Sequence, residues 1–177
     1  MIFYDTMPSP VGRLLLVSED EGLTGLYFES FRHGLRPADD WRRAPDSEAL
    51  RAARTQLDGY FDSSLGDFTL PLAPRGTPFQ QRVWAELRAI RRGETISYGE
   101  LARRIGDPRA VRAVAGANAR NPISIIVPCH RVIGADGSLT GFGGGLERKR
   151  WLLNHESGGH SRGDPHLIPS QASDLVS

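Results

Sequence analysis

The sequence predicts an α+β protein with two domains: a small sheet carrying one helix, then a winged helix-turn-helix domain. Three observations support this class. Short apolar runs separated by turn residues occupy the first thirty positions, whereas several capped helical patterns follow residue 77. Between them, residues 71–76 hold two prolines and a glycine, which is typical of a linker. We therefore expect domains over residues 1–75 and 76–157, and a disordered, Gly-, Ser- and Pro-containing tail over 158–177.

The first domain is predicted to contain a small sheet and one helix. Its expected strands cover residues 2–7, 11–18, 23–28 and 68–70. Residues 30–45 lack a clear period, so we expect a loop there. Asp46 can cap a helix that runs to about Phe61, because the apolar side chains in this segment follow helical spacing.

The second domain carries clearer helix boundaries. Residues 77–80 offer a threonine N-cap, a proline at the first helical position and a capping-box glutamine, and Gly93 ends this helix. Residues 97–100 form a second capping box for a helix through about Ile105. Asp107-Pro108 starts a third helix that runs to about Arg120. The remaining expected elements are a strand over 123–127, a hairpin turn over 135–138 and a helix over 146–155.

The two short helices that meet at Gly106-Asp107 resemble a helix-turn-helix, and the following hairpin would make it winged. Helix pairs of this kind are also common packing units, so the pair alone leaves DNA binding open. Charge adds to the DNA-binding interpretation. Residues 1–75 carry a net charge of −4 and residues 76–156 a net charge of +6. A basic second domain favours a polyanionic partner, although a randomly decorated surface gives a similar imbalance.

Composition excludes several classes of protein. The chain has 177 residues, 39% hydrophobic and 24% charged, as in ordinary globular proteins. Its apolar runs stay well short of the ~20 residues that a membrane span needs, and the N-terminus lacks the pattern of a signal peptide. The single cysteine cannot form an internal disulfide or a multi-thiolate zinc site. We therefore expect a cytoplasmic protein without membrane partners.

That single cysteine, Cys129, lies in the most informative segment of the chain. A β-branched run, Ile125 to Val127, ends at Pro128, and the thiol follows beside His130 and Arg131. Only the thiolate is a strong nucleophile, and basic neighbours raise its fraction. The sequence therefore predicts a reactive cysteine; the alternative is a buried structural thiol.

Residues 127–132 resemble the active-site signature of the methylated-DNA–protein-cysteine methyltransferases, the O6-alkylguanine-DNA alkyltransferases. The resemblance covers about residues 76–156. Further matching segments occur in the family's order at residues 93–98, 112–114, 121–122 and 151–156. The first domain matches loosely, and the resemblance implies a ribonuclease-H-like fold there.

The resemblance implies a suicide repair reaction. The protein would flip O6-alkylguanine out of duplex DNA and transfer the alkyl group irreversibly to its own cysteine, restoring guanine. It would enter the minor groove with little sequence specificity. It would act as a monomer in solution, and clustering on DNA stays open. No metal or organic cofactor is implied, because the zinc site of some members needs N-terminal cysteines that this chain lacks.

Five residues resemble the family's catalytic set. Cys129 matches the alkyl acceptor, His130 the base that draws its proton through water, and Glu156 the carboxylate that orients this histidine. Asn121 matches a hinge asparagine, and Tyr98 a tyrosine that helps to rotate and protonate the base. Taken singly, each has a plain alternative, such as a helix stop for Asn121 or a core aromatic for Tyr98.

Other residues resemble the family's DNA and base contacts. Arg112 matches the arginine that fills the space left by the flipped base; a bland arginine on a helix face is the alternative. Residues expected at the DNA are Arg112, Tyr98, Gly99 and Ala135, and residues expected at the alkyl pocket are Phe142, Gly143 and Val132. Phe142 is a departure, since tyrosine is common there. Phenylalanine keeps the pocket wall but loses the hydroxyl, so we expect retained activity with an altered rate or substrate preference.

Two other functions compete with repair. One is a lesion-binding module that flips bases without chemistry, which the presence of Cys129 disfavours. The other is a Cys-His hydrolase, for which the sequence offers no evident oxyanion-hole motif. A single stoichiometric burst on alkylated DNA, as opposed to turnover on esters, separates these possibilities.

Overall fold

The computed structural model describes residues 1–29 and 36–158, and it contains two compact units, residues 1–74 and residues 75–158. Residues 159–177 of the predicted tail and residues 30–35 of the predicted loop lie outside the described residues. No described helix is both long and apolar enough to span a membrane.

The first unit is built on a four-stranded sheet. Its strands are β1 (Phe3–Met7), β2 (Leu14–Glu19), β3 (Gly22–Phe28) and β4 (Arg42–Arg43). They lie in the order β3-β2-β1-β4, with β2 antiparallel to both β1 and β3 and with β4 parallel to β1. Tyr4 pairs with Val17, and Leu16 pairs with Leu26. β2 is buried along almost its whole length, so it forms the centre of this core.

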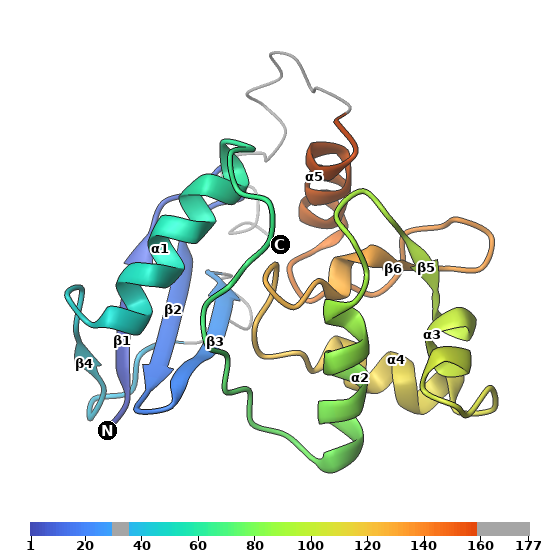
Figure 1. Cartoon of the computed structure of the whole chain (residues 1–177), viewed down its shortest axis with the longest axis horizontal. Coiled ribbons are helices and arrows are strands. Elements are labelled where there is room, and N and C mark those ends of the chain that lie inside the picture. The colour runs from blue at the N-terminus through green and yellow to red at the C-terminus, as the bar shows by residue number, and fades with distance from the viewer. Residues whose placement is uncertain (30–35, 159–177) are drawn as a thin grey trace, which may run out of the picture. The chain divides into compact units, whose positions relative to one another are not determined.

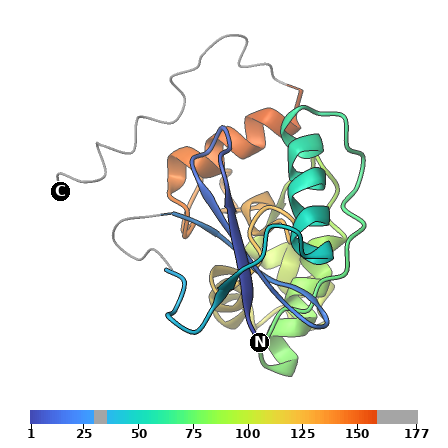
Figure 2. The ribbon, with the colours of Figure 1, turned by 90° about the vertical axis from the view of Figure 1, so that its left-hand side faces the viewer.

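One helix, α1 (Glu48–Phe61), lies along this sheet in Figures 1 and 2 and packs on β1, β2 and β3. Its buried side chains follow the predicted helical spacing, and they are Leu50, Ala53, Leu57 and Tyr60. The N-cap is Ser47, so the predicted cap at Asp46 is wrong by one residue. An ion pair between Arg54 and the buried carboxylate of Asp5 ties α1 to β1.

Three further predictions for the first unit are corrected. The second strand begins at Leu14 and not at residue 11, because a turn with Gly12 at φ 98° precedes it. β4 lies inside the predicted loop, where it pairs with β1. Residues 68–70 are not a strand. Instead Leu23 forms an isolated parallel bridge with Leu72, and the Leu23 amide donates to the carbonyl of Pro71 at 3.1 Å.

The second unit begins with α2 (Pro78–Arg88), and the predicted capping box is present. The Thr77 hydroxyl accepts from the Gln80 amide, and the Gln80 side chain accepts from the Thr77 amide at 2.9 Å. The helix ends at Arg88 rather than at Gly93. The Trp84 indole, on the buried face of α2, donates to the Ala117 carbonyl at 2.8 Å. This bond ties α2 to a later segment of the same unit.

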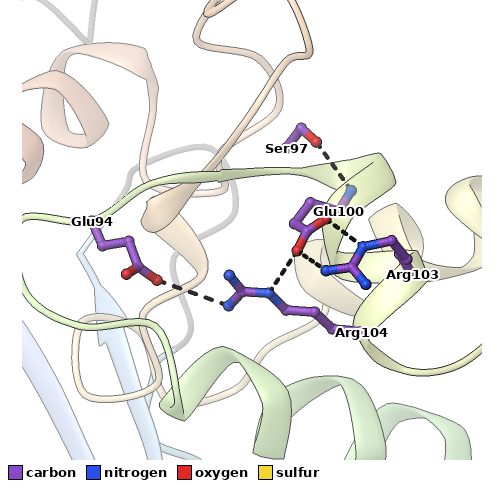
Figure 3. A network of polar contacts seen from close by, with 5 residues as sticks. All are labelled: Glu94, Ser97, Glu100, Arg103 and Arg104. Atoms are coloured by element: carbon purple, nitrogen blue, oxygen red, sulfur yellow. Dashed lines mark hydrogen bonds and ion pairs between the residues drawn. The ribbon is translucent and has the colours of Figure 1, made fainter.

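The next helix, α3 (Tyr98–Arg104), follows β5 (Ile96–Ser97). Ser97 caps it by accepting from the Glu100 amide at 3.0 Å, but the predicted second capping box is not completed. The Glu100 carboxylate instead accepts from Arg103 at 2.7 Å and from Arg104 at 3.1 Å, as Figure 3 shows. These hydrogen bonds lower the pKa of Glu100 to about 2. Arg104 also pairs with Glu94, which ties α3 to the segment before β5.

The helix pair is completed by α4 (Val111–Ala119), which packs on both α2 and α3. This helix begins at Val111, two residues later than predicted. Asp107-Pro108 forms a turn and does not start the helix, because the Asp107 carbonyl accepts from the Ala110 amide at 3.0 Å. Gly106, at φ 91°, supplies the left-handed residue that ends α3.

After α4, the predicted strand over residues 123–127 is wrong. The segment turns tightly, with Ile125 at φ 70° and the Val127 amide donating to the Ile123 carbonyl at 3.0 Å. A short helical turn, η1 (Cys129–Arg131), and β6 (Val132–Ile133) follow. β6 pairs in parallel with β5, and the turn predicted over 135–138 forms. No second strand follows this turn within the described chain up to residue 158, so the predicted hairpin wing is absent there.

The last described helix is α5 (Leu146–Glu156), one residue longer than predicted at its C-terminal end. It packs against η1. Leu152 and Glu156 on its buried face therefore lie beside the turn that carries the single cysteine. The α+β class, with a sheet unit followed by a helical unit, is confirmed.

Candidate active site

Cys129 begins the η1 turn, and only 6% of its surface is exposed. Its amide donates to the Val127 carbonyl at 2.8 Å, which fixes the chain immediately before the thiol. The buried Asn118 side chain approaches the Cys129 carbonyl at 3.4 Å. Val132, predicted at the alkyl pocket, is fully buried just after the turn. The thiol thus sits on a short, tightly held segment.

Burial raises the pKa of the Cys129 thiol, and a hydrogen bond with Asn121 and the positive charge of Lys149 oppose this effect only in part. The expectation that sequence neighbours favour the thiolate is therefore wrong for the resting protein. Arg131 does not serve the sulfur, because its guanidinium donates to Glu156 and to the Ile90 carbonyl. Reaction at Cys129 requires a base that removes the proton when the substrate is in place.

His130, Arg131 and Glu156 form a buried network. The His130 Nε2 lies 2.8 Å from Oε2 of Glu156. Arg131 binds the same carboxylate in a bidentate manner, through Nε to Oε1 at 2.8 Å and through a second nitrogen to Oε2 at 3.0 Å. Glu156 comes from α5 and the other two residues from η1, so the network also joins these elements.

Protonation states in this network follow from burial and charge. Burial lowers the pKa of His130, and Glu156 opposes that shift. Burial alone would raise the pKa of Glu156, but His130 and Arg131 outweigh it and hold that pKa below its usual range. An ionised carboxylate can only accept, so a neutral His130 donates through Nε2 and keeps its lone pair on Nδ1. That Nδ1 atom is buried and has no hydrogen-bond partner among the residues that the structure describes.

Asn121 holds the turn that leads to the cysteine. Its Nδ2 donates to the carbonyls of Val127 at 2.7 Å and Ile123 at 3.3 Å, and its Oδ1 accepts from the Ile123 amide at 3.0 Å. These bonds span residues 121–127, where Ile125 adopts its left-handed conformation. Asn121 therefore interacts with the thiol and also stabilises the segment that precedes it.

Tyr98 lies at the start of α3, half-buried, and its hydroxyl donates to the Thr140 carbonyl at 3.2 Å. Burial raises the pKa of Tyr98, the Thr140 bond opposes this, and negative charge on Cys129 adds to it. The phenol therefore keeps its proton near neutral pH.

Lys149, to which the sequence assigned no role, donates to the carbonyls of Val132 at 2.7 Å and Thr140 at 2.9 Å. A pattern in the sequence could have found it. Lys149 precedes Leu152 by three residues and Glu156 by seven, so the three residues share one helical face. A lysine that shares a helical face with a buried leucine and a proposed catalytic carboxylate is expected to be buried and not solvated. Asn118 is a further buried residue at the η1 turn, and the sequence assigned it no role.

The remaining predicted residues are less buried than the thiol. Arg112 and Gly99 are exposed on the first turns of α4 and α3, and Ala135 is exposed in the turn after β6. Phe142 and Gly143 lie in the loop between β6 and α5, with Phe142 partly buried. Within the described residues, no three His, Cys, Asp or Glu side chains cluster as a metal site would require.

The chain thus combines a sheet unit with a helical unit in which a buried cysteine, a candidate nucleophile, directly precedes the histidine of a buried His-Arg-Glu network. Two family models match the chain. The model described as "6-O-methylguanine DNA methyltransferase, ribonuclease-like domain" matches residues 2–74, and "6-O-methylguanine DNA methyltransferase, DNA binding domain" matches residues 78–158. The ribonuclease-like first domain expected from the resemblance is thereby confirmed.

Curated relatives and solved structures agree. The methylated-DNA–protein-cysteine methyltransferase of Haemophilus influenzae is 48% identical over 156 residues, 88% of this chain and 86% of that protein. The Mycobacterium tuberculosis protein of that name is 51% identical over 157 residues, 88% and 93% respectively. The crystal structure of the M. tuberculosis O6-methylguanine methyltransferase matches with a TM-score of 0.80 and 49% identity, covering 89% of this chain and 94% of that one. The chain belongs to the methylated-DNA–protein-cysteine methyltransferase family, and its function is alkyl transfer in DNA repair.

Proposed function

We propose that this protein flips an O6-alkylated guanine out of duplex DNA and takes its alkyl group once, irreversibly, on Sγ of Cys129. The observation that carries this proposal is the buried Cys129 followed by a neutral His130 whose Nε2 is engaged by Glu156 and whose Nδ1 is not engaged. A base with one nitrogen held and one lone pair available suits proton removal from a thiol whose pKa burial has raised.

The proposed step is a nucleophilic displacement at the alkyl carbon. The thiol proton passes through a water to Nδ1 of His130, and the thiolate attacks the alkyl carbon. The S–C bond forms while the bond between that carbon and O6 breaks, and its electron pair stays with the guanine. Tyr98 gives the departing base a proton, and the imidazolium of His130 returns the thiol proton through solvent to the Tyr98 phenolate, so both side chains end in their starting states. The products are guanine and a stable thioether, so each molecule acts once.

Glu156 and Arg131 support the proposed base. An ionised Glu156 stabilises the imidazolium that forms at His130, because opposite charges interact strongly in a buried site. Arg131 holds this carboxylate through two hydrogen bonds, so Glu156 cannot turn away from His130. The network therefore provides a preorganised environment for a transient positive charge.

The second unit is also the proposed DNA-binding surface. The crystal structure of M. tuberculosis OGT in complex with DNA matches this chain with a TM-score of 0.79 and 45% identity, covering 98% of this chain. We infer that α4 enters the minor groove with little sequence specificity, and that the protein is a monomer in solution, with clustering on DNA left open. The exposed Arg112 on the first turn of α4 would occupy the space of the flipped base, while Gly99 and Ala135 would lie along the backbone. Phe142 and Gly143 would line the base pocket.

Equimolar protein and duplex DNA containing one O6-methylguanine should yield a single methyl group on the Cys129 peptide, measured by peptide mass spectrometry. The DNA lesion should disappear in step with the modification, and a second equivalent of damaged DNA should remain unrepaired. Cys129→Ser should bind the lesion and transfer nothing measurable. Tight lesion binding by the natural chain with an unmodified Cys129 would instead indicate a damage-recognition protein without chemistry.

Arg112→Ala should slow methyl transfer about ten-fold at saturating DNA, because the flipped state loses the side chain that replaces the base. Arg109→Ala is the matched control, since it removes one exposed positive charge from the preceding turn. Both variants should lose similar affinity for undamaged duplex. Single-turnover rates and fluorescence anisotropy separate the two effects, and equal transfer rates for both variants would contradict the role of Arg112.

A further inference from the structure

Asn118, in the last turn of α4, has a buried side chain whose oxygen is left without a hydrogen bond. Only 3% of the residue is exposed. In the described part of the chain, three buried side-chain atoms have no hydrogen-bond partner: Oδ1 of Asn118, Nδ1 of His130 and Oδ1 of Asp5. Asp5 belongs to the sheet unit, where the Arg43 guanidinium lies 3.4 Å from this oxygen. The other two atoms belong to side chains beside the nucleophile.

The side-chain amide of Asn118 lies against the peptide group that joins Cys129 to His130. The carbonyl oxygen of Cys129 is 3.4 Å from Nδ2 of Asn118. This oxygen can only accept a hydrogen bond, so the nitrogen faces it and Oδ1 of the same planar amide points elsewhere. His130 follows this carbonyl directly in the chain. The two unsatisfied atoms therefore belong to side chains that adjoin one peptide group.

A water molecule can satisfy both atoms at once. Unsatisfied buried polar atoms are costly, and buried waters in proteins commonly make about three hydrogen bonds to such atoms. In the proposed function, a water carries the thiol proton to Nδ1 of His130. That water accepts from the thiol and donates one hydrogen to Nδ1, which leaves its second hydrogen in need of an acceptor. Oδ1 of Asn118 is a buried acceptor with no other partner in the described chain.

We propose that Asn118 is a positioning residue for alkyl transfer, whose Oδ1 accepts one hydrogen of the water that relays the proton from Cys129 to His130. The inference rests on the proposed function and names the group that orients its relay. During the relay the S–H bond breaks, its electron pair stays on sulfur, and the proton forms a new O–H bond at the water. The O–H bond that points to Nδ1 breaks, and an N–H bond forms there. The hydrogen held by Asn118 stays on the water throughout, so the water keeps its orientation.

Asn118→Leu tests the proposal, because leucine has the same branching and removes both the acceptor and the donor. At saturating duplex containing O6-methylguanine, this variant should transfer methyl about ten-fold more slowly, since the relay water is left with an unpaired hydrogen in a buried site. Affinity for DNA should stay near the natural value, because Asn118 is buried. Asn154→Leu, at an exposed position of α5, is the matched control and should transfer at the natural rate. An unchanged rate in a folded Asn118→Leu protein would overturn the inference.

A double-mutant cycle separates the relay from a structural effect on the Cys129 turn. Loss of the hydrogen bond to the Cys129 carbonyl would slow transfer whether or not His130 is present. The relay acts only through His130, so Asn118→Leu should have little further effect in a His130→Gln background. Equal fold losses of rate in the natural and His130→Gln backgrounds would reject the relay role.

If Asn118→Leu fails to fold, the pair Asn118→Ser and Asn118→Ala decides, because the two side chains differ by one acceptor oxygen. Asn118→Ser should transfer about five-fold faster than Asn118→Ala, and equal rates would count against the inference. Failure of the proposed function gives a different result. A natural chain that binds damaged DNA but leaves Cys129 unmethylated rejects that function, and the relay with it.

Discussion

Glu156→Gln should both destabilise the protein and slow methyl transfer. Glutamine has the same shape but no charge, so Arg131 and His130 lose their buried anionic partner. Removal of one member of a buried ion pair typically costs roughly 3–5 kcal/mol, because the remaining charge is left uncompensated. Transfer should slow on the order of 100-fold, since the His130 imidazolium loses its stabilising carboxylate. Chemical denaturation and single-turnover rates measure the two effects.

The same substitution should change the dependence of stability on pH. The pKa of Glu156 is lowered in the folded protein, so its contribution to stability is present above the pKa of the unfolded carboxyl, ~4.3, and is lost as the pH falls toward the folded value. Glu156→Gln lacks this component, and its stability should fall less steeply below about pH 4. His130, whose pKa burial lowers, penalises the folded state below about pH 6.5 in both proteins.

Glu147→Gln is the control for this experiment, because Glu147 lies exposed on the first turn of the same helix. It should leave the transfer rate unchanged and shift stability by less than about 0.5 kcal/mol. Glu156→Asp, which keeps the charge on a shorter side chain, should recover part of the rate if Glu156→Gln folds poorly. Natural transfer rates in a folded Glu156→Gln protein would show that His130 does not need this carboxylate.

Local patterns in the sequence predicted those parts of the fold that depend on local interactions. The Thr77–Gln80 capping box involves residues three positions apart, and it is present as predicted. β4 could not be predicted in this way, because two arginines form a strand only where β1 supplies hydrogen bonds from a distant segment. The family and its alkyl-transfer function followed from the cysteine segment and its matching neighbours.

The apolar run Ile123–Val127 shows where pattern reasoning fails. Its β-branched residues correctly indicate burial, but burial does not distinguish a strand from a buried turn. The turn exists because the Asn121 side chain supplies hydrogen bonds that a partner strand would otherwise supply. Lys149 illustrates a related limit: spacing within α5 indicates that its side chain is buried, but its hydrogen-bond partners are carbonyls of two other segments, which that spacing does not specify.

Asn121→Ala should therefore damage the site more than the loss of one polar side chain suggests. Alanine removes three hydrogen bonds that brace residues 121–127 and leaves the Ile123 amide without its acceptor. We expect a loss of roughly 2–4 kcal/mol in the free energy of unfolding, since each bond contributes about 1 kcal/mol and an unsatisfied buried amide adds a penalty. Asn154→Ala, at an exposed position of α5, should be nearly neutral.

Asn121→Asp distinguishes the structural role of Asn121 in residues 121–127 from its effect on the Cys129 thiol. Aspartate can still accept from the Ile123 amide, but it cannot donate to the Val127 carbonyl or to the sulfur, and it places a negative charge beside the thiol. The pKa of Cys129 should rise further, because a like charge disfavours the thiolate. Iodoacetamide alkylation should then require higher pH, and methyl transfer at neutral pH should slow by more than ten-fold. A folded Asn121→Asp protein with the natural pH profile would mean that Asn121 braces the turn without influencing the sulfur.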